Sequence, residues 1–380
     1  MNFALKKQIV NLVYDFFSFI CLFIAILCLI FKLKSLENFK LDNLEFLAVK
    51  SVWPRGNFNF NVKNIFNNNL YANDFSDFEN QNENSIFKYK NLNKQSDVKI
   101  PDFKTDSETQ EYHSPDEIKH KIIENHFSAG GIKFENIYVK NRTGLEIDIS
   151  KELEKSPEIN IKNTKEPQVL IVHTHTSESY MKDDSGFYYD SFYPRTADNT
   201  QNITRVGQAI TDKLIENGIN TVHDITCHDN PTYNGSYSRA ARTIEENLKK
   251  YPSIQVVIDI HRDSLGSNET GKIKPVFKYN DKKSAQLMII SGCDPDQSLG
   301  HPNWEKNLRL ALRLQKYCET LFPGITRPLN FAKVRYNQHL TPGSMLIEVG
   351  SDANTLEEAV NTGYMLGQAL SNLLNDLKKQ

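Results

Sequence analysis

Three clusters of side chains that could do chemistry follow short apolar runs in this chain of 380 residues. The clusters read HTHTSESY at residues 173–180, DIHRD at 259–263 and EVGS at 348–351. A short apolar run indicates a buried strand, so each cluster stands where a strand should end. In open sheets of parallel strands, ligands bind beyond the carboxyl ends of the strands. The three clusters are therefore predicted to converge on one site.

Imidazoles and carboxylates recur in these clusters, and both are zinc ligands. His173 and His175 form an H-x-H pair, and an extended chain would point both imidazoles to one side. Two histidines and a carboxylate with one open position make a catalytic zinc site, and a second glutamate could serve as its base. Two structural alternatives stay open. The H-x-H pair could belong to the core, and Asp259 and Glu348 could form ion pairs with Arg262.

The elements that must position these clusters alternate between strand and helix from residue 167 onward. Apolar runs predict strands at residues 169–172, 219–222, 256–260, 285–290 and 345–348. Helical spacing predicts helices at residues 203–214, 236–250 and 303–321, and Thr355 with Glu358 forms a capping box that starts a last helix. This alternation predicts an α/β, three-layer domain with a mostly parallel sheet. We expect it to span residues 126–380, with a leading strand pair at 137–139 and 145–149.

The first 33 residues contain an apolar segment long enough to cross a membrane. Residues 16–31 read FFSFICLFIAILCLIF and carry no charge. With their apolar neighbours they nearly span a hydrocarbon core of about 30 Å. A cleaved signal peptide is the alternative, but the segment is longer than an ordinary signal core and no small-residue cleavage site follows it. We expect residues 1–33 to form a cytoplasmic tip and a single-pass transmembrane helix, which places the chain at a cell membrane.

Residues 34–125 have the composition of a tether. Thirteen asparagines lie between residues 57 and 93, and no helical or strand period persists there. Such a low-complexity, polar segment is expected to be disordered. A flexible tether of this length has a root-mean-square span of about 50–60 Å, so the C-terminal domain could act well away from the membrane surface.

Composition excludes two classes of protein. With 45 Lys and Arg against 47 Asp and Glu, the chain lacks the basic excess of a nucleic-acid-binding protein, and no nucleic-acid partner is expected. Two of the five cysteines lie in the apolar segment. The other three, Cys227, Cys293 and Cys318, lack C-x-x-C spacing, which excludes zinc-knuckle and dithiol-redox motifs.

Longer motifs around the clusters resemble the stage II sporulation protein P family over roughly residues 130–375. The motifs are VLIVHTHTSESY at 169–180, NITRVGQAI at 202–210, HDITCHDNPTYNGSYSRA at 223–240, VIDIHRDS at 257–264 and YNQHLTPGSMLIEVGSDANTLEEA at 336–359. The resemblance implies a membrane-anchored cell-wall hydrolase of endospore-forming bacteria, with a catalytic domain similar to the zinc N-acetylmuramoyl-L-alanine amidases. It implies Zn²⁺ as cofactor and peptidoglycan as substrate, with endopeptidase cleavage of cross-links as a further activity. It also implies action outside the cytoplasm during septum thinning and engulfment, together with stage II sporulation proteins D and M.

One departure from the amidase pattern affects the ligand set. The wider zinc amidases carry a ligand Glu at the start of the helix after the first strand, whereas the matching residues 198–202, DNTQN, contain none. The resemblance then implies His175 and His261 as zinc ligands, with Glu178 as the available carboxylate. His173 would replace His175 or orient a ligand from behind.

The implied reaction is metal-assisted hydrolysis of an amide bond. Glu348 would take a proton from the attacking water and give it to the leaving amine. Arg262 would act at the substrate, and Asp263, Asn337 and Gln338 would help to bind it. Residues 228–237 would wall the groove without a chemical role. Two alternatives stay open: an inactive domain that binds peptidoglycan or activates another hydrolase, and a metal-dependent deacetylase or carboxypeptidase.

Overall fold

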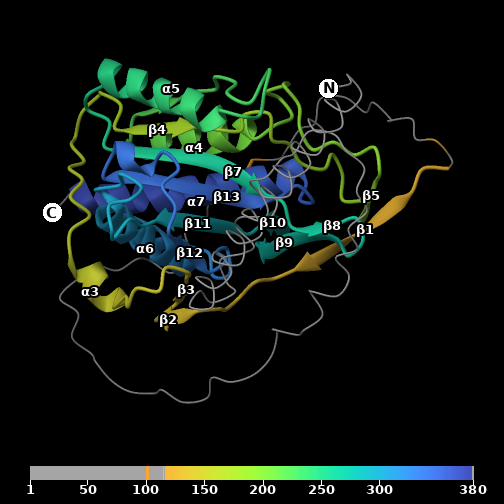
Figure 1. The fold of residues 1–380 in the computed structure, drawn as a ribbon, viewed down its shortest axis with the longest axis horizontal. Coiled ribbons are helices and arrows are strands. Elements are labelled where there is room, and N and C mark those ends of the chain that lie inside the picture. Colours follow the sequence, from red (N-terminus) through yellow and green to blue (C-terminus); the bar gives the residue numbers. More distant parts are fainter. Residues whose placement is uncertain (1–99, 102–113, 115, 379–380) are drawn as a thin grey trace, which may run out of the picture. The chain divides into compact units, whose positions relative to one another are not determined.

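An eight-stranded sheet forms the centre of the part of the chain that this computed structural model describes, residues 100–101, 114 and 116–378 (Figure 1). In spatial order its strands are β2 (Ile132–Phe134), β3 (Ile137–Asn141), β12 (Leu329–Ala332), β11 (Leu287–Gly292), β13 (Gly343–Ser351), β7 (Val256–Asp263), β4 (Val169–Val172) and β6 (Thr221–His223). Five neighbouring pairs are parallel, and the β2–β3 and β11–β13 pairs are antiparallel. The predicted α/β fold with a mostly parallel sheet is confirmed.

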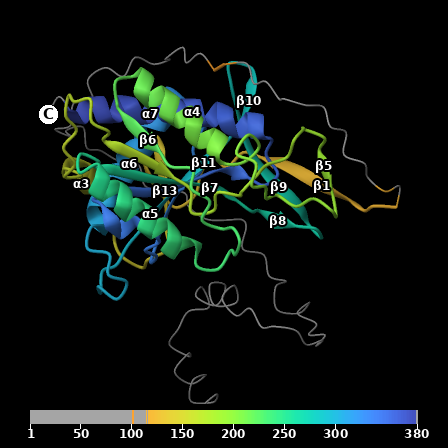
Figure 2. The same cartoon turned by 90° about the horizontal axis from the view of Figure 1, so that it is seen from above.

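Helices cover both faces of this sheet, which gives three layers. The helices are α3 (Ile149–Glu154), α4 (Thr204–Glu216), α5 (Ser236–Lys250), α6 (Trp304–Leu321) and α7 (Leu356–Lys378). Figure 2 shows α4 and α7 on one side of the sheet and α5 on the other. Val169 and Ile171 of β4 pack in the large apolar cluster that includes α4, α6 and α7. Leu170 and Val172 point the opposite way and pack with Ile244 of α5, because successive side chains of a strand alternate between faces.

The start of α7 matches the predicted capping box. Glu358 N–H donates to Thr355 Oγ1 at 3.2 Å, and Thr355 N–H donates to Glu358 Oε2 at 3.0 Å. The reciprocal bonds satisfy backbone donors that a helix start leaves without partners. The helices predicted at 203–214, 236–250 and 303–321 are also present, as α4, α5 and α6.

A second sheet was not predicted. It contains β10 (Lys282–Ala285), β9 (Gly271–Tyr279), β1 (Lys119–Asn125) and β5 (Phe187–Tyr189) in that order, and β8 (Gly266–Ser267) pairs with β9. Strand β1 lies within the segment assigned to the tether, so the folded part of the chain begins before residue 126. Its sequence, KHKIIEN, has no clear alternation. The strand is fixed by pairing with β9 and β5, which are remote in sequence.

The predicted strand at residues 145–149 is wrong. The strand pair at this point consists of β2 and β3, and the chain after residue 144 runs into α3. Asp148 caps this helix, because its carboxylate accepts the Lys151 N–H at 3.1 Å. The preference of Asp148 for a helix N-cap therefore outweighs the apparent strand-like alternation of residues 145–149.

The predicted transmembrane segment, residues 16–31, and residues 34–99 of the predicted tether lie outside the described residues. Among the residues that are described, no helix is long and apolar enough to cross a membrane.

Candidate active site

The carboxyl ends of β4, β7 and β13 bring four of the predicted residues to one edge of the sheet. His261 of β7 and Glu348 of β13 are direct partners in the parallel register of these strands. His175 and Glu178 lie in the chain that follows β4. The ring centres of His175 and His261 are 5.3 Å apart, and Glu178 Oε2 lies 3.6 Å from His261 Nδ1. The three sequence clusters therefore converge, as predicted.

Several polar atoms of this site are buried without a hydrogen-bond partner. They are His175 Nδ1, His261 Nε2 and Glu348 Oε2. His261 Nε2 lies 3.0 Å from Asp259 Oδ1, which is an ion-pair distance, but the two groups are not aligned as a hydrogen bond. Most buried polar atoms in proteins have a partner, so a cluster of atoms without one points to a missing ligand or to bound water.

The carboxylates around His261 set its charge. Burial alone would lower the pKa of His261, but Asp259, and then Glu178 and Glu348, outweigh this effect and raise it to about 10. His175 behaves in the opposite way, because burial and then the charge of His261 lower its pKa to about 3. The surroundings therefore favour the neutral form of His175 and the protonated form of His261.

These side chains fit zinc by donor type. Two imidazoles and a carboxylate are the ligand types of catalytic zinc sites, and two of the unpartnered atoms are imidazole nitrogens. Zinc binds neutral imidazole, so His261 would have to be deprotonated to serve as a ligand. Within residues 116–378 and the few others described, no three His, Cys, Asp or Glu side chains form a group that could hold a metal ion as they stand. The proposed donors nevertheless lie at one sheet edge, with His261 close to both His175 and Glu178.

His173 lies apart from this group. Its Nδ1 is 3.1 Å from Ile260 O and its Nε2 is 2.9 Å from His223 Nε2. The alternation of β4 explains this position, since His173 continues the series of Ile171 towards α4. The chain then turns, which carries His175 towards His261. The H-x-H segment is not extended, and the expectation that both imidazoles point to one side is wrong.

Arg262 holds a loop in place. Its guanidinium donates to Ser179 O at 3.0 Å and to Pro194 O at 2.8 Å. Its backbone N–H donates to Glu178 Oε2 at 3.1 Å. The Arg262 side chain therefore does not form the alternative ion pair with Asp259. Its guanidinium is also occupied by backbone carbonyls, so it is not open to substrate. Asp259 accepts the N–H and hydroxyl of Thr174 instead.

The three residues predicted to bind substrate also join separate segments of the fold. Asp263 Oδ2 accepts a bond from Arg327 at 2.9 Å. Asn337 donates to Tyr237 O at 3.0 Å. Gln338 bonds to the backbone of Gly292 and Ile290 in β11. Asn337 and Gln338 line a small cavity together with Asp259. Their role towards a substrate stays a prediction.

Sequence reasoning missed the aromatic side chains around the two imidazoles. Tyr233 stacks on His175 with ring centres 4.3 Å apart and an interplanar angle of 7°. Tyr237 lies nearly parallel to His261, and Tyr336 stacks on Tyr237 at 5.2 Å. The motif at 228–237 pointed to a wall of the groove, but nothing in it showed that its tyrosines meet the histidines.

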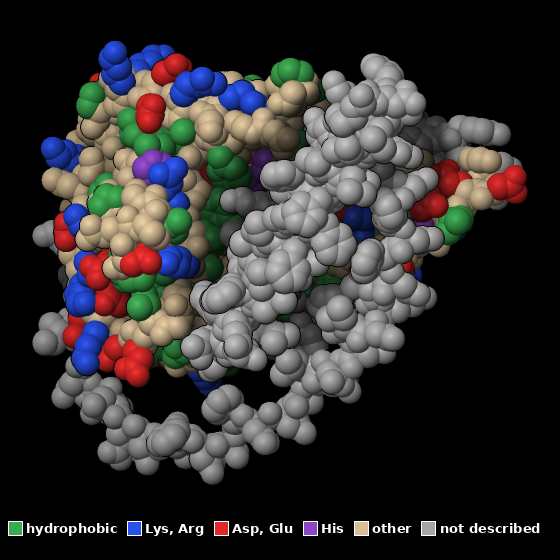
Figure 3. All heavy atoms as spheres, in the orientation of Figure 1, with side chains coloured by type: hydrophobic (Ala, Val, Ile, Leu, Met, Phe, Trp, Pro, Cys, Tyr) green, Lys and Arg blue, Asp and Glu red, His purple; other side chains and the backbone are tan. Residues whose placement is uncertain are grey.

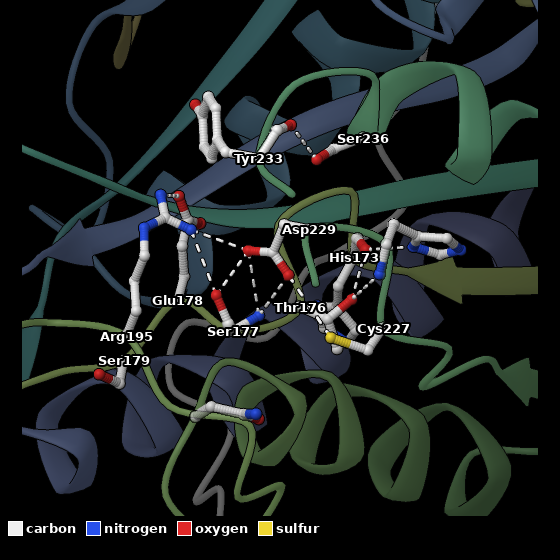
Figure 4. A network of polar contacts seen from close by, with 12 residues as sticks. His173, Thr176, Ser177, Glu178, Ser179, Arg195, Cys227, Asp229, Tyr233 and Ser236 are labelled. Atoms are coloured by element: carbon white, nitrogen blue, oxygen red, sulfur yellow. Dashed lines mark hydrogen bonds and ion pairs between the residues drawn. The ribbon is translucent and has the colours of Figure 1, made fainter. Parts of the chain in front are cut away.

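Sequence reasoning also missed Arg195. Its Nη1 lies 2.8 Å from Asp229 Oδ2, and its Nη2 lies 3.5 Å from Glu178 Oε1. Figure 4 shows this guanidinium between the two carboxylates, with Ser177 bonded to Asp229 beside it. No motif could have indicated the contact, since Arg195 and Asp229 are joined only by the fold.

A family model described as Stage II sporulation protein P (SpoIIP) matches residues 54–371. The chain belongs to this family. The resemblance inferred from the five motifs is thereby confirmed.

A curated relative, Stage II sporulation protein P of Bacillus subtilis (strain 168), is 28% identical over 223 residues. The match covers 56% of this chain and 52% of the relative, so it spans about half of that protein's length.

Solved amidase structures are similar to part of the chain. N-acetylmuramoyl-L-alanine amidase AmiC2 of Nostoc punctiforme is 12% identical with a TM-score of 0.32, and the match covers 56% of this chain and 98% of that one. The CwlD amidase of Clostridioides difficile, in complex with the GerS lipoprotein, is 11% identical with a TM-score of 0.34, over 55% of this chain and 99% of that one. The catalytic domain of CwlV from Bacillus (Paenibacillus) polymyxa var. colistinus is 16% identical with a TM-score of 0.31, over 55% and 97%.

The first turn of α4 carries no acidic residue, in line with the departure noted in the sequence. Of the carboxylates near His261, Glu178 lies on the loop before α4, and its backbone carbonyl accepts the Ile203 N–H at 2.7 Å, immediately before that helix. Glu178 therefore lies on the loop that leads towards this helix.

Proposed function

We propose that this chain is a zinc-dependent peptidoglycan hydrolase that cleaves the amide bond between N-acetylmuramic acid and L-alanine. The observation that carries the proposal is the convergence of His175, Glu178, His261 and Glu348 at one sheet edge, with three buried atoms that lack partners. Membership of the SpoIIP family supports a role in sporulation. Endopeptidase cleavage of stem-peptide cross-links is proposed as a second activity of the same site.

His175, Glu178 and His261 would hold the zinc. When bound, the metal would polarise the scissile carbonyl and lower the pKa of a water molecule towards 7. Glu348 would then accept the proton of that water and pass it to the leaving amine. Burial raises the pKa of Glu348 to about 8 despite the nearby charge of His261. A carboxyl group with a pKa near the working pH can both accept and donate a proton.

A purified-substrate digestion tests this activity. The full chain is incubated with purified peptidoglycan, with and without a chelator, and the soluble products are separated and identified. Stem peptides that begin with L-alanine are expected, and the chelator should abolish them. Shortened stems would show endopeptidase cleavage, and released acetate would instead identify a deacetylase.

A second candidate function is a catalytically inactive domain that binds peptidoglycan or activates another hydrolase. It is favoured by the lack, among the described residues, of a ready group of three metal ligands. Sedimentation with peptidoglycan but no product in the same digestion would support this candidate and reject hydrolysis.

We also propose a place and partners. The N-terminal helix at 16–31 would anchor the chain in a cell membrane with the catalytic domain outside the cytoplasm, where peptidoglycan lies. Stage II sporulation proteins D and M would be partners during engulfment. Nucleic acid is not expected, and acidic and basic side chains are mixed over the uncovered part of the face in Figure 3. Protease added to intact protoplasts should degrade the domain, whereas full protection would reject this placement.

A further inference from the structure

We infer that Arg195 and Asp229 form a positioning pair that fixes Glu178 for metal binding. The inference rests on the proposed function, because it concerns the carboxylate ligand of the proposed zinc site. It also gives a chemical task to the motif at 228–237, for which the sequence suggested none.

Asp229 is the fixed end of the pair. Its carboxylate accepts the Ser177 N–H at 3.1 Å and the Ser177 hydroxyl at 2.6 Å, and its side chain is almost completely buried. The Arg195 guanidinium donates to it at 2.8 Å, which is the length of a charge-assisted hydrogen bond. Asp229 therefore holds both the backbone next to Glu178 and the arginine that faces Glu178.

Arg195 then reaches the ligand itself. Its second nitrogen lies 3.5 Å from Glu178 Oε1, while the other oxygen of this carboxylate accepts the Arg262 N–H at 3.1 Å. The backbones of Glu178 and Arg195 also form an antiparallel bridge, so the two side chains start from adjacent points. One oxygen of Glu178 is thus guided by Arg195 and the other by the end of β7.

The same pair is connected to the first candidate imidazole. The Arg195 guanidinium lies 4.9 Å from the ring centre of Tyr233, and Tyr233 stacks on His175 at 4.3 Å. Tyr233 and Asp229 belong to the same loop. This loop therefore contacts His175 directly and Glu178 through Arg195. Groups that orient ligands in this way commonly change metal affinity 10- to 100-fold when they are altered.

Removing the charge of Arg195 would change the Zn²⁺ affinity in two opposite directions. Loss of the positive charge would strengthen binding by reducing repulsion of the metal ion, whereas loss of the contact would weaken it because Glu178 would be less well ordered. Arg195→Lys separates them, because lysine keeps the charge but a single nitrogen cannot replace the planar fork that touches two carboxylates. Arg309→Lys is the matched control: the Arg309 guanidinium also faces two carboxylates, Glu152 at 2.9 Å and Glu305 at 3.5 Å, neither of which is a proposed site residue.

The experiment measures Zn²⁺ affinity of the full chain by competition with a chelating dye, and the melting temperature of the metal-free chain. Arg195→Lys should weaken zinc binding by about 10-fold or more. Its melting temperature should change no more than that of Arg309→Lys, whose zinc affinity should match the wild type. The further loss of zinc affinity caused by Asp229→Asn should be smaller in the Arg195→Lys background than in the wild type, because the contact between the two side chains is already lost there.

Four outcomes would overturn the inference. Wild-type zinc affinity in Arg195→Lys would show that Arg195 does not position the ligand. Equal loss in Arg309→Lys would show a general effect on the fold. A wild-type chain that hydrolyses peptidoglycan without binding zinc would reject the positioning role but leave hydrolysis intact, whereas one that does neither would reject both proposals.

Discussion

Buried polar and charged side chains differ between two parts of this domain in whether they have partners. Around Lys274 of β9, opposite charges are paired: its ammonium lies 2.5 Å from Asp184 and 2.8 Å from Glu358, and Lys283 bridges Asp184 to Glu124. At the edge formed by β4, β7 and β13, buried imidazole and carboxylate atoms lack hydrogen-bond partners. Satisfied buried charge holds the second sheet against α7. Buried polar atoms without hydrogen-bond partners point to a ligand or to bound water, which is why the second region is the candidate site.

The largest expected effect is the loss of metal and activity in His261→Ala. Removing this imidazole takes away one proposed ligand, so zinc content and hydrolysis should both fall to background. Zinc is measured by elemental analysis and hydrolysis by dye release from labelled peptidoglycan. His120→Ala is the control, because His120 lies on β1 of the second sheet and both of its nitrogens have partners, Asn268 O at 3.1 Å and Asp190 Oδ1. Retained zinc and activity in His261→Ala would falsify the assignment.

Glu348→Gln should abolish turnover but keep the metal. The amide preserves size but cannot carry a proton, and general acid–base catalysis contributes about 10²–10⁴ to the rate. Hydrolysis should therefore fall at least about 100-fold, with normal zinc content. Glu319→Gln is the control: Glu319 is also a mostly buried glutamate whose pKa burial raises, but Gly324 and Thr326 satisfy it. Loss of zinc in Glu348→Gln would instead make Glu348 a ligand.

Lys274→Met should reduce stability without affecting the chemistry. Removing the lysine leaves the buried carboxylate of Glu358 without its counter-ion, and breaking a buried pair costs about 3–5 kcal/mol. The free energy of unfolding is measured by denaturant titration, and hydrolysis is expressed per folded molecule. Lys283→Met, at a more exposed position, should cost less than about 1 kcal/mol. Equal costs for the two variants would show that burial of Lys274 adds nothing.

The smallest expected effect concerns the acid dependence of stability. Partial burial would raise the pKa of Asp184, but Lys274 and Lys283 outweigh it and hold the pKa below its ordinary value. The resulting stabilisation is present above the ordinary pKa of an aspartate, near 4, and is lost as the pH falls through the lower pKa of the folded state. Asp184→Asn should therefore flatten the fall in melting temperature below about pH 4. An identical pH profile in wild type and variant would contradict this account.

Much of the main sheet and part of the site follow from local sequence. Short apolar runs predicted most strands of the large sheet, though not β12, and helical spacing predicted α4, α5 and α6. The Thr355–Glu358 capping box marked the start of α7 within one residue. His261 and Glu348 were identified because polar residues directly follow buried strands, and parallel pairing places both at the same edge. These features depend on residues that are near one another in the chain, so their pattern is visible without the fold.

The contacts between distant segments were decided only by the tertiary structure. The turn after His173, which separates its imidazole from that of His175, is not marked by any strong turn signal. The Arg262 guanidinium donates to Ser179 O and Pro194 O because a loop from another part of the chain packs against it. Strand β1 exists because β9 and β5 supply its hydrogen bonds. Arg195 and Asp229 meet across 34 positions of sequence for the same reason: the partner of a side chain is set by packing, and local patterns cannot encode it.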